Sequence, residues 1–277
     1  MSATTAPAAA AQIDRNWPAV TLARVVRSEW TKLHTLRSTR WSLLAAVLGM
    51  AGLGPAVAAV QMSRWGQLGA EERSHFDAID AGVGGYHLAQ LAIGVLGVLV
   101  ITGEYSTGMI RSSFMAVPRR LPVLWAKLLV FSAVTFALML VSTIVSFYAV
   151  QAIVTQHDQQ VGLGAPHALR AIIGTALFLT VLGVLAVGLG ALVRNTAGGI
   201  ASFVAILFVL PGVVALLPST TADHLTPYLP LNAGSAVATS RFDSTHHLAP
   251  WAGFTVFAVY AVVVVIVAAF GLLRRDA

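Results

Sequence analysis

The stretch Leu169–Val193, which reads LRAIIGTALFLTVLGVLAVGLGALV, decides the fold class of this chain. Its only charged residue is Arg170, close to one end. A helix needs about 20 mainly apolar residues to cross the hydrocarbon core of a bilayer, and this stretch is long enough to do so. It therefore predicts a membrane-spanning helix.

Five more apolar runs of similar character lie on either side of this stretch. The six predicted spans are 41–60, 86–103, 124–150, 169–193, 197–217 and 251–273. The composition agrees, because 57% of the residues are hydrophobic and only 10% are charged, whereas soluble domains carry about 25% charged residues. We predict an all-α integral membrane protein whose six-span domain covers residues 41–273.

The basic residues predict how the spans are oriented. With the N-terminus in the cytoplasm, thirteen of the 17 Lys and Arg residues fall on the inner side of the membrane. Positive charge gathers on the cytoplasmic side of membrane proteins, so both termini are expected in the cytoplasm and the membrane is expected to be the plasma membrane. The net charge of +6 is then explained by orientation, and no nucleic-acid partner is predicted.

The segment before the first span has two parts. Residues 1–19 are rich in Ala, Thr and Pro and are expected to be a disordered tail. At the other end of the chain, residues 274–277 are expected to form a short cytoplasmic tail. Residues 20–40 have the pattern of an amphipathic helix. Its apolar positions are Leu22, Val25, Val26, Trp30, Leu33 and Leu36, and its polar ones include Arg24, Arg27, Glu29, Lys32 and Arg37. Such a helix lies in the membrane interface, either as an anchor alone or also as a contact for a cytosolic subunit.

The loop between the second and third spans, residues 103–127, is expected to be ordered. It begins GEYSTGMIR, in which Ser106 or Thr107 could cap a short helix that continues from Arg111 to Ala116. Pro122 is suited to the first turn of the third span. Glu104 could pair with Arg111 or Arg119, or it could be an interfacial charge that merely ends the second span, and the spacing leaves both open.

The predicted spans lack the groups that drive or catalyse reactions in membranes. No acidic or basic residue lies well inside a span, and Lys127 and Arg170 are expected to snorkel from span ends. This argues against a transporter coupled to protons or sodium. The chain also lacks cysteine, a G-x-x-x-x-G-K-[ST] phosphate loop and an H-E-x-x-H motif. The neighbouring His246 and His247 do not by themselves form a chelate, so no metal site is predicted.

Two stretches resemble permeases of the type-2 ATP-binding-cassette (ABC) family, with the strongest likeness to actinobacterial members. They are Ser28–Thr39 (SEWTKLHTLRST) and Gly103–Arg111, and the run Val117–Arg120 (VPRR) adds to the likeness. The resemblance implies an exporter built from two permease subunits, identical or different, and two cytosolic ATPase subunits that bind ATP and Mg²⁺. This chain would itself hold no cofactor.

The resemblance also implies roles for particular residues. In the helix before the first span, the connecting helix, they are Glu29, Trp30, Lys32 and Arg37. Those that would transmit motion from the ATPase are Glu104, Tyr105, Ser106, Thr107, Gly108, Met109 and Arg111. Residues 218–250 resemble the family's outer re-entrant segment.

One face of the third span carries a polar stripe formed by Thr135, Met139, Ser142 and Ser146. The stripe could line a translocation path, but close packing between helices is the favoured interpretation. Two other functions remain as alternatives: a non-transporting scaffold or immunity protein and, least favoured, an intramembrane enzyme. The ordered loop at 103–127 argues against a scaffold, and the lack of a recognisable nucleophile or acid–base pair in the spans argues against an enzyme.

Overall fold

The computed structural model describes residues 21–116, 121–240 and 248–274. Within these ranges the chain forms helices and no strands. The predicted disordered tail 1–19, the run Val117–Arg120, the pair His246 and His247, and residues 275–277 lie outside the described residues.

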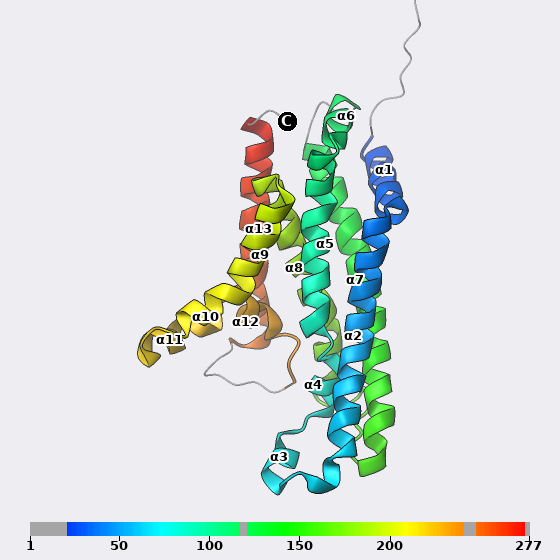
Figure 1. Cartoon of the computed structure of the whole chain (residues 1–277), viewed down its shortest axis with the longest axis vertical. Helices are drawn as coiled ribbons and strands as arrows, with labels where there is room; N and C mark the ends of the chain where they lie inside the picture. Colours follow the sequence, from blue (N-terminus) through cyan, green and yellow to red (C-terminus); the bar gives the residue numbers. More distant parts are fainter. Residues whose placement is uncertain (1–20, 117–120, 241–247, 275–277) are drawn as a thin grey trace, which may run out of the picture.

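Long helices dominate the structure (Figure 1). They are α2 (Arg37–Ser63), α5 (Tyr86–Ser106), α7 (Leu121–Val154), α8 (Ala168–Val193) and α13 (Pro250–Arg274). In the described residues, six segments are long and apolar enough to cross a membrane: Arg37–Ser63, Ala78–Ser106, Leu121–His157, Ala168–Val193, Thr196–Val214 and Pro250–Arg274. The prediction of an all-α protein with six spans is confirmed.

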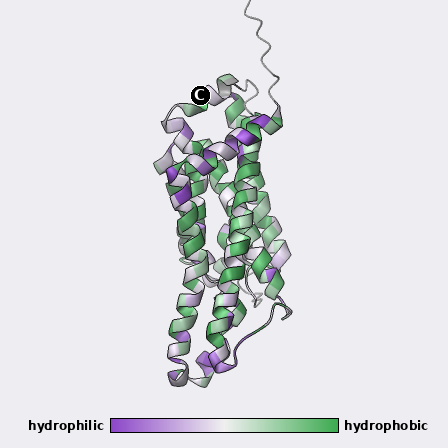
Figure 2. Cartoon of the chain, turned by 90° about the vertical axis from the view of Figure 1, so that its right-hand side faces the viewer, coloured by the Kyte–Doolittle hydropathy of each residue, from purple (hydrophilic) through white to green (hydrophobic). Residues whose placement is uncertain are grey.

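Shorter elements lie at the two ends of these spans. They are α1 (Leu22–Thr35), η1 (Trp65–Gln67), α3 (Ala70–His75), α4 (Ala78–Val83), α6 (Met109–Ala116), η2 (Thr155–His157), α11 (Ser219–Leu225), η4 (Thr226–Tyr228) and α12 (Pro230–Ser235). We call the end of the molecule that carries α1 and α6 the inner end, following the predicted orientation, and the end that carries α3 the outer end (Figure 1). In Figure 2, hydrophobic residues fill most of the length of the spans, and hydrophilic residues gather toward the two ends.

Helix α8 is the centre of the bundle. It packs against α5, α7 and α13. Within an apolar stretch of 18 residues in this helix, 72% is buried inside the protein. Glycines allow this close approach: a Cβ atom on Gly97 of α5 would lie 2.7 Å from the carbonyl oxygen of Gly183 on α8. Small residues serve the same purpose in many membrane proteins, where helices associate by close packing.

The fifth span differs most from its predicted form. It consists of α9 (Thr196–Val204), a π-helical segment (Ala205–Val209) and α10 (Leu210–Val214), so it stops short of the predicted end at 217. Pro211 explains the irregular turn, because it has no amide hydrogen to donate and its ring crowds the carbonyl of Leu207. From there α10 and α11 diverge from the bundle (Figure 1).

The described part of the segment after the fifth span, residues 215–240, is broken into short helices and partly buried. Helix α12 packs against α13, and the following Ala236, Val237 and Ala238 are almost completely buried. Arg170 of α8 donates to the carbonyl oxygen of Ser240 at 3.3 Å and, at longer range, to those of Ala236 and Val237. Arg170 therefore holds this segment to the bundle, in addition to its predicted place near a span end.

Candidate functional site

The helix before the first span is shorter than predicted and turns a different face to the bundle. Leu36 has an extended backbone (φ −70°, ψ 124°) that ends α1, so Arg37 is the first residue of α2 and does not belong to the connecting helix. The buried residues of α1 are Val25, Glu29 and Leu33, whereas Trp30 is half exposed. Glu29 was expected on the polar surface, but the structure buries it against α7.

The end of α5 is built by residues of the predicted coupling segment. The Ser106 and Thr107 hydroxyls donate to the carbonyl oxygen of Gly103, at 3.0 and 2.8 Å. They therefore finish α5. The expectation that one of them caps the following helix is wrong, because α6 begins at Met109 and the residue directly before it is Gly108. Gly108 then adopts a positive φ of 71°, a conformation that costs glycine little. The chain turns there and enters α6 at Met109.

The start of α7 contributes Lys127, which hydropathy alone places at the membrane interface. Lys127 lies in the first turns of α7 and is 3% exposed. The expectation that it snorkels to the membrane surface is wrong, because its ammonium group points into the protein and is paired there. The signal was present in the sequence: an ionisable residue inside a span normally has a partner.

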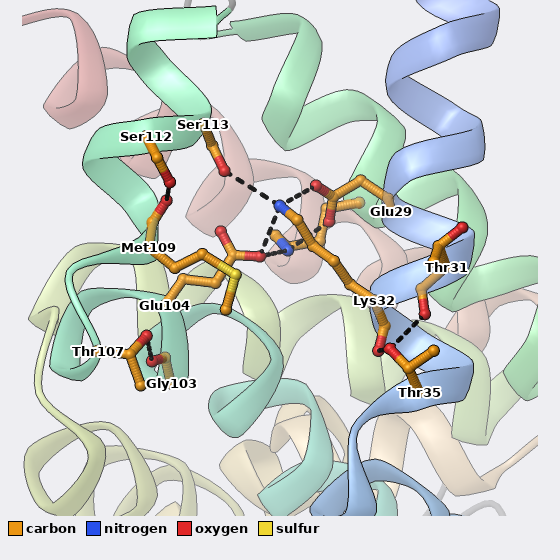
Figure 3. Close-up of polar contacts among 11 residues, drawn as sticks. Glu29, Thr31, Lys32, Thr35, Gly103, Glu104, Thr107, Met109, Ser112 and Ser113 are labelled. Carbon is orange, nitrogen blue, oxygen red and sulfur yellow. Dashed lines mark hydrogen bonds and ion pairs between the residues drawn. The ribbon is translucent and has the colours of Figure 1, made fainter.

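Four charged side chains meet between these helices, and Figure 3 labels three of them, Glu29, Lys32 and Glu104. We call Glu29, Lys32, Glu104 and Lys127 the charge cluster. Lys127 Nζ donates to Glu29 Oε2 at 2.5 Å and to Glu104 Oε1 at 2.7 Å. Lys32 Nζ donates to Glu29 Oε1 at 2.6 Å and to Glu104 Oε1 at 3.0 Å. The charge cluster thus joins α1, α5 and α7 through two acids and two bases.

A fourth helix reaches the charge cluster through Ser113 of α6. Lys32 Nζ donates to Ser113 Oγ at 3.1 Å. The ammonium group of this α1 residue therefore contacts both Glu104 of α5 and Ser113 of α6. Figure 3 shows this ammonium group between the carboxylates of Glu29 and Glu104 and the Ser113 hydroxyl. Lys32 therefore links α1 directly to α6.

The charge cluster carries no net charge and is largely buried. Its two carboxylates and two ammonium groups cancel, and the Glu29, Glu104 and Lys127 side chains are at most 5% exposed. Burial lowers the pKa of Lys32, but the hydrogen bond with Glu29 and the negative charges of Glu104 and Glu29 outweigh it and hold that pKa above the usual lysine value. Removal of one charge would leave its partner buried and uncompensated.

One carboxylate oxygen in the charge cluster is less well satisfied. Glu104 Oε2 is buried and has no hydrogen-bond partner among the described residues. A cavity of about 20 Å³ lies beside Glu29, Lys32, Glu104 and Lys127. This is enough room for one water molecule, which needs roughly 10–15 Å³. The charge cluster is thus a connected polar network with little free space.

The remaining predicted coupling residues lie around the charge cluster. The Tyr105 ring is covered by the guanidinium of Arg194, whose Cζ atom is 5.4 Å from the ring centroid. Met109 is partly buried at the start of α6. The Arg111 and Arg119 side chains lie outside the described part of the structure, so the suggested pairing with Glu104 stays a prediction. The contacts described for Glu104 are with Lys32 and Lys127.

The polar stripe on α7 faces the inside of the bundle. Thr135, Met139, Ser142 and Ser146 are all 4% exposed or less. A Cβ atom on Gly54 of α2 would lie 2.9 Å from Ser146 Oγ, so the two helices touch at this point. Ser142 donates to the carbonyl of Leu138 on its own helix. Within this subunit the stripe occupies a contact between helices.

The described residues contain no group of three His, Asp or Glu side chains arranged to hold a metal ion. The charge cluster includes two carboxylates, but two ammonium groups already occupy them. Its chemistry is that of ion pairing between helices.

Comparison with protein families fits this architecture. The family model for ABC-2 family transporter protein matches residues 25–212, which is more than half of the chain and includes most of α1 and the entire charge cluster. The chain belongs to the ABC-2 transporter family. No curated protein matches the chain in a direct sequence comparison.

Membership of the ABC-2 family places this chain among the membrane components of ABC transporters. It is a multi-pass membrane permease, and the family works with an ABC ATPase subunit. The matched region ends at 212, within α10, so the diverging α11 and the segment that follows lie beyond it.

Proposed function

We propose that this chain is the permease subunit of an ABC exporter in the plasma membrane. Separate cytosolic ATPase subunits would bind ATP and Mg²⁺, and a second permease subunit, identical or different, would complete the complex. The observation that carries the proposal is the charge cluster, which ties the connecting helix α1 and the short helix α6 to the spans α5 and α7.

This arrangement suits the transmission of force. A docking element must pass its movement to the spans, and a rigid, neutral network of ion pairs between them does so without a flexible joint. Lys32 Nζ contacts α1, α5 and α6 partners at once. A push on α6 would therefore reach α5 and, through Glu104, Lys127 of α7.

The face of α6 away from the charge cluster is the proposed contact for the ATPase. Met115 lies on α6 and is 78% exposed, which is unusual for a large apolar side chain at the end of a bundle that carries many charges. Methionine is common at protein interfaces, where its flexible side chain adapts to a partner surface. Gly108 turns the chain so that α6 projects from the end of α5.

The test is co-purification of the tagged full-length chain from its native host in mild detergent. We expect an ABC ATPase to be recovered at equal stoichiometry. Met115→Glu should reduce its recovery by about tenfold, since one lost contact of roughly 1.4 kcal/mol has that effect. The matched control is Leu216→Glu, which changes a similarly exposed apolar residue just beyond α10, where the chain has diverged from the bundle.

Each result has a clear meaning. Loss of the ATPase from Met115→Glu alone supports docking at α6. Equal recovery with both variants would place the ATPase elsewhere. If the wild-type chain is recovered without an ATPase even in native lipid, the exporter proposal fails and a non-transporting scaffold or immunity protein becomes the better interpretation.

A further inference from the structure

A second group of basic side chains lies at the inner end and is formed by residues that do not belong to the charge cluster. Arg194 follows the last residue of α8, and Arg274 is the last residue of α13. They line one cavity of about 420 Å³, which is within the range of about 300–1,000 Å³ that is usual for ligand sites. The remaining walls are mostly apolar and include Leu192, Val267 and Phe270.

The two arginines differ in how they are held. Arg194 Nη2 donates to the carbonyl oxygen of Gly271 at 3.1 Å, and its guanidinium covers the Tyr105 ring. This fixes its position at the cavity wall. Arg274 is exposed and forms no ion pair or hydrogen bond within the described residues. Arg194 is thus held by protein groups, whereas Arg274 is exposed beside the same cavity.

The order of these groups along the membrane normal matches the structure of a phospholipid. The cations stand at the ends of α8 and α13, where headgroups lie, and the apolar side chains of Leu192, Val267 and Phe270 come from the turns before those ends. Val267 and Phe270 are 50% and 58% exposed, so the cavity opens toward the surroundings of the bundle. Basic pockets between spans on the cytoplasmic side suit anionic headgroups.

We propose that this cavity binds one anionic phospholipid of the inner leaflet. The lipid phosphate would accept hydrogen bonds from Arg194 and Arg274, and the start of an acyl chain would lie along Val267 and Phe270. Arginine suits this task because its planar guanidinium pairs with phosphate oxygens in two places. The site would exist in the permease alone.

The test is native mass spectrometry of the purified, delipidated full-length chain. It would be titrated with phosphatidylglycerol and, separately, with phosphatidylcholine of the same acyl chains, and the dissociation constant of the first bound lipid would be measured. We expect phosphatidylglycerol to bind more tightly. Arg274→Gln should weaken it by about fivefold, because one arginine near an anionic lipid contributes about that factor, and should weaken phosphatidylcholine less, because the choline cation of that lipid already offsets its phosphate.

Three further variants make the result specific. Arg194→Gln combined with Arg274→Gln should bring phosphatidylglycerol to the level of phosphatidylcholine. Val267→Trp should weaken phosphatidylglycerol by filling the apolar wall, without any change in charge. Arg27→Gln removes an exposed charge of α1 from the same end and should change nothing, which separates a defined site from general attraction.

Several outcomes would overturn the proposal. They are equal binding of the two lipids to the wild-type chain, an unchanged constant in Arg274→Gln, or an equal loss in Arg27→Gln. Competition with glycerol phosphate distinguishes a lipid from a free phosphate. If millimolar glycerol phosphate displaces phosphatidylglycerol, the cavity is a site for small anions. None of these measurements involves the ATPase, so they do not depend on the proposed exporter function.

Discussion

At the scale of single residues, the charge cluster is neutral only while all four members are present. Glu104→Gln would leave two ammonium groups to share the Glu29 carboxylate, and Lys127→Gln would leave an excess of negative charge. Breaking a buried pair in this way costs about 3–5 kcal/mol. We expect each variant to lower the thermal midpoint of the purified chain in detergent, and the double variant Glu104→Gln with Lys127→Gln to recover much of the loss.

The double variant separates charge balance from packing. If the two losses simply add, the side chains act independently and the charge cluster is not a unit. Glu71→Gln is the matched control, because Glu71 is an exposed acid on α3 at the outer end. It should leave the thermal midpoint unchanged.

The raised pKa of Lys32 predicts how stability depends on pH. The folded state holds the Lys32 proton more tightly than the unfolded chain does, with Glu29, Glu104 and Lys127 as its charged neighbours. Its contribution is therefore fully present below the unfolded pKa of about 10.4 and is lost as pH rises through the higher folded value. Lys32→Arg should retain stability in that alkaline range, since a guanidinium keeps its proton, and thermal unfolding between about pH 9 and 12 would measure the difference.

The sequence contains all four members of the charge cluster, but it does not show that their side chains are in contact. Family resemblance indicates roles for Glu29, Lys32 and Glu104, whereas hydropathy alone places Lys127 at the membrane interface. Glu29 and Lys127 are 98 positions apart, and only the folded bundle shows that α1 turns Glu29 inward. The apolar periodicity of α1 predicts that Glu29 lies on the polar face, because such a pattern treats every charged residue as exposed. It does not consider that an ion pair can offset the free-energy cost of burying a carboxylate.

At the scale of elements, the contact between α2 and α5 depends on the absence of a side chain at Gly85. A Cβ atom there would meet backbone atoms of Met50, with the carbonyl carbon at 2.6 Å and Cα at 2.7 Å. Backbone atoms cannot rotate away, so Gly85→Ala should force the helices apart and destabilise the chain by about 1–3 kcal/mol or more. Gly52→Ala on α2 meets nothing within 4 Å and should be tolerated. The yield of monodisperse protein would compare the two, and equal yields would contradict this account.

The sequence predicted the spans far better than the breaks between them. Length and hydropathy are enough to find a span because lipid demands an apolar helix of known length. The π-helical turn at Ala205–Val209 and the early start of the second span at Ala78 depend on local contacts. Asp77 explains the second case, since its carboxylate accepts from the amides of Ile79 and Asp80 and begins α4.

At the scale of the whole molecule, the number of spans was predictable and their arrangement was not. Each span is apolar on most sides, so the residues that face lipid resemble those that face other helices. Val262 and Phe257 of α13 illustrate this, because the first is 54% exposed and the second is completely buried. The position of α8 at the centre follows from its glycines and from contacts that only the structure reveals.

The orientation of the molecule in the membrane is the prediction on which the coupling proposal depends. The chain has no cysteine, so single cysteines introduced at its two ends can be labelled without background. Ser112 of α6 and Glu71 of α3 are exposed at opposite ends of the bundle. In intact cells, a maleimide that cannot cross membranes should label Glu71→Cys, and it should label Ser112→Cys only after permeabilisation. The opposite pattern would put α1, α6 and the charge cluster on the outer side, where no cytosolic ATPase reaches them, and positive charge would then have accumulated on the wrong side of the membrane.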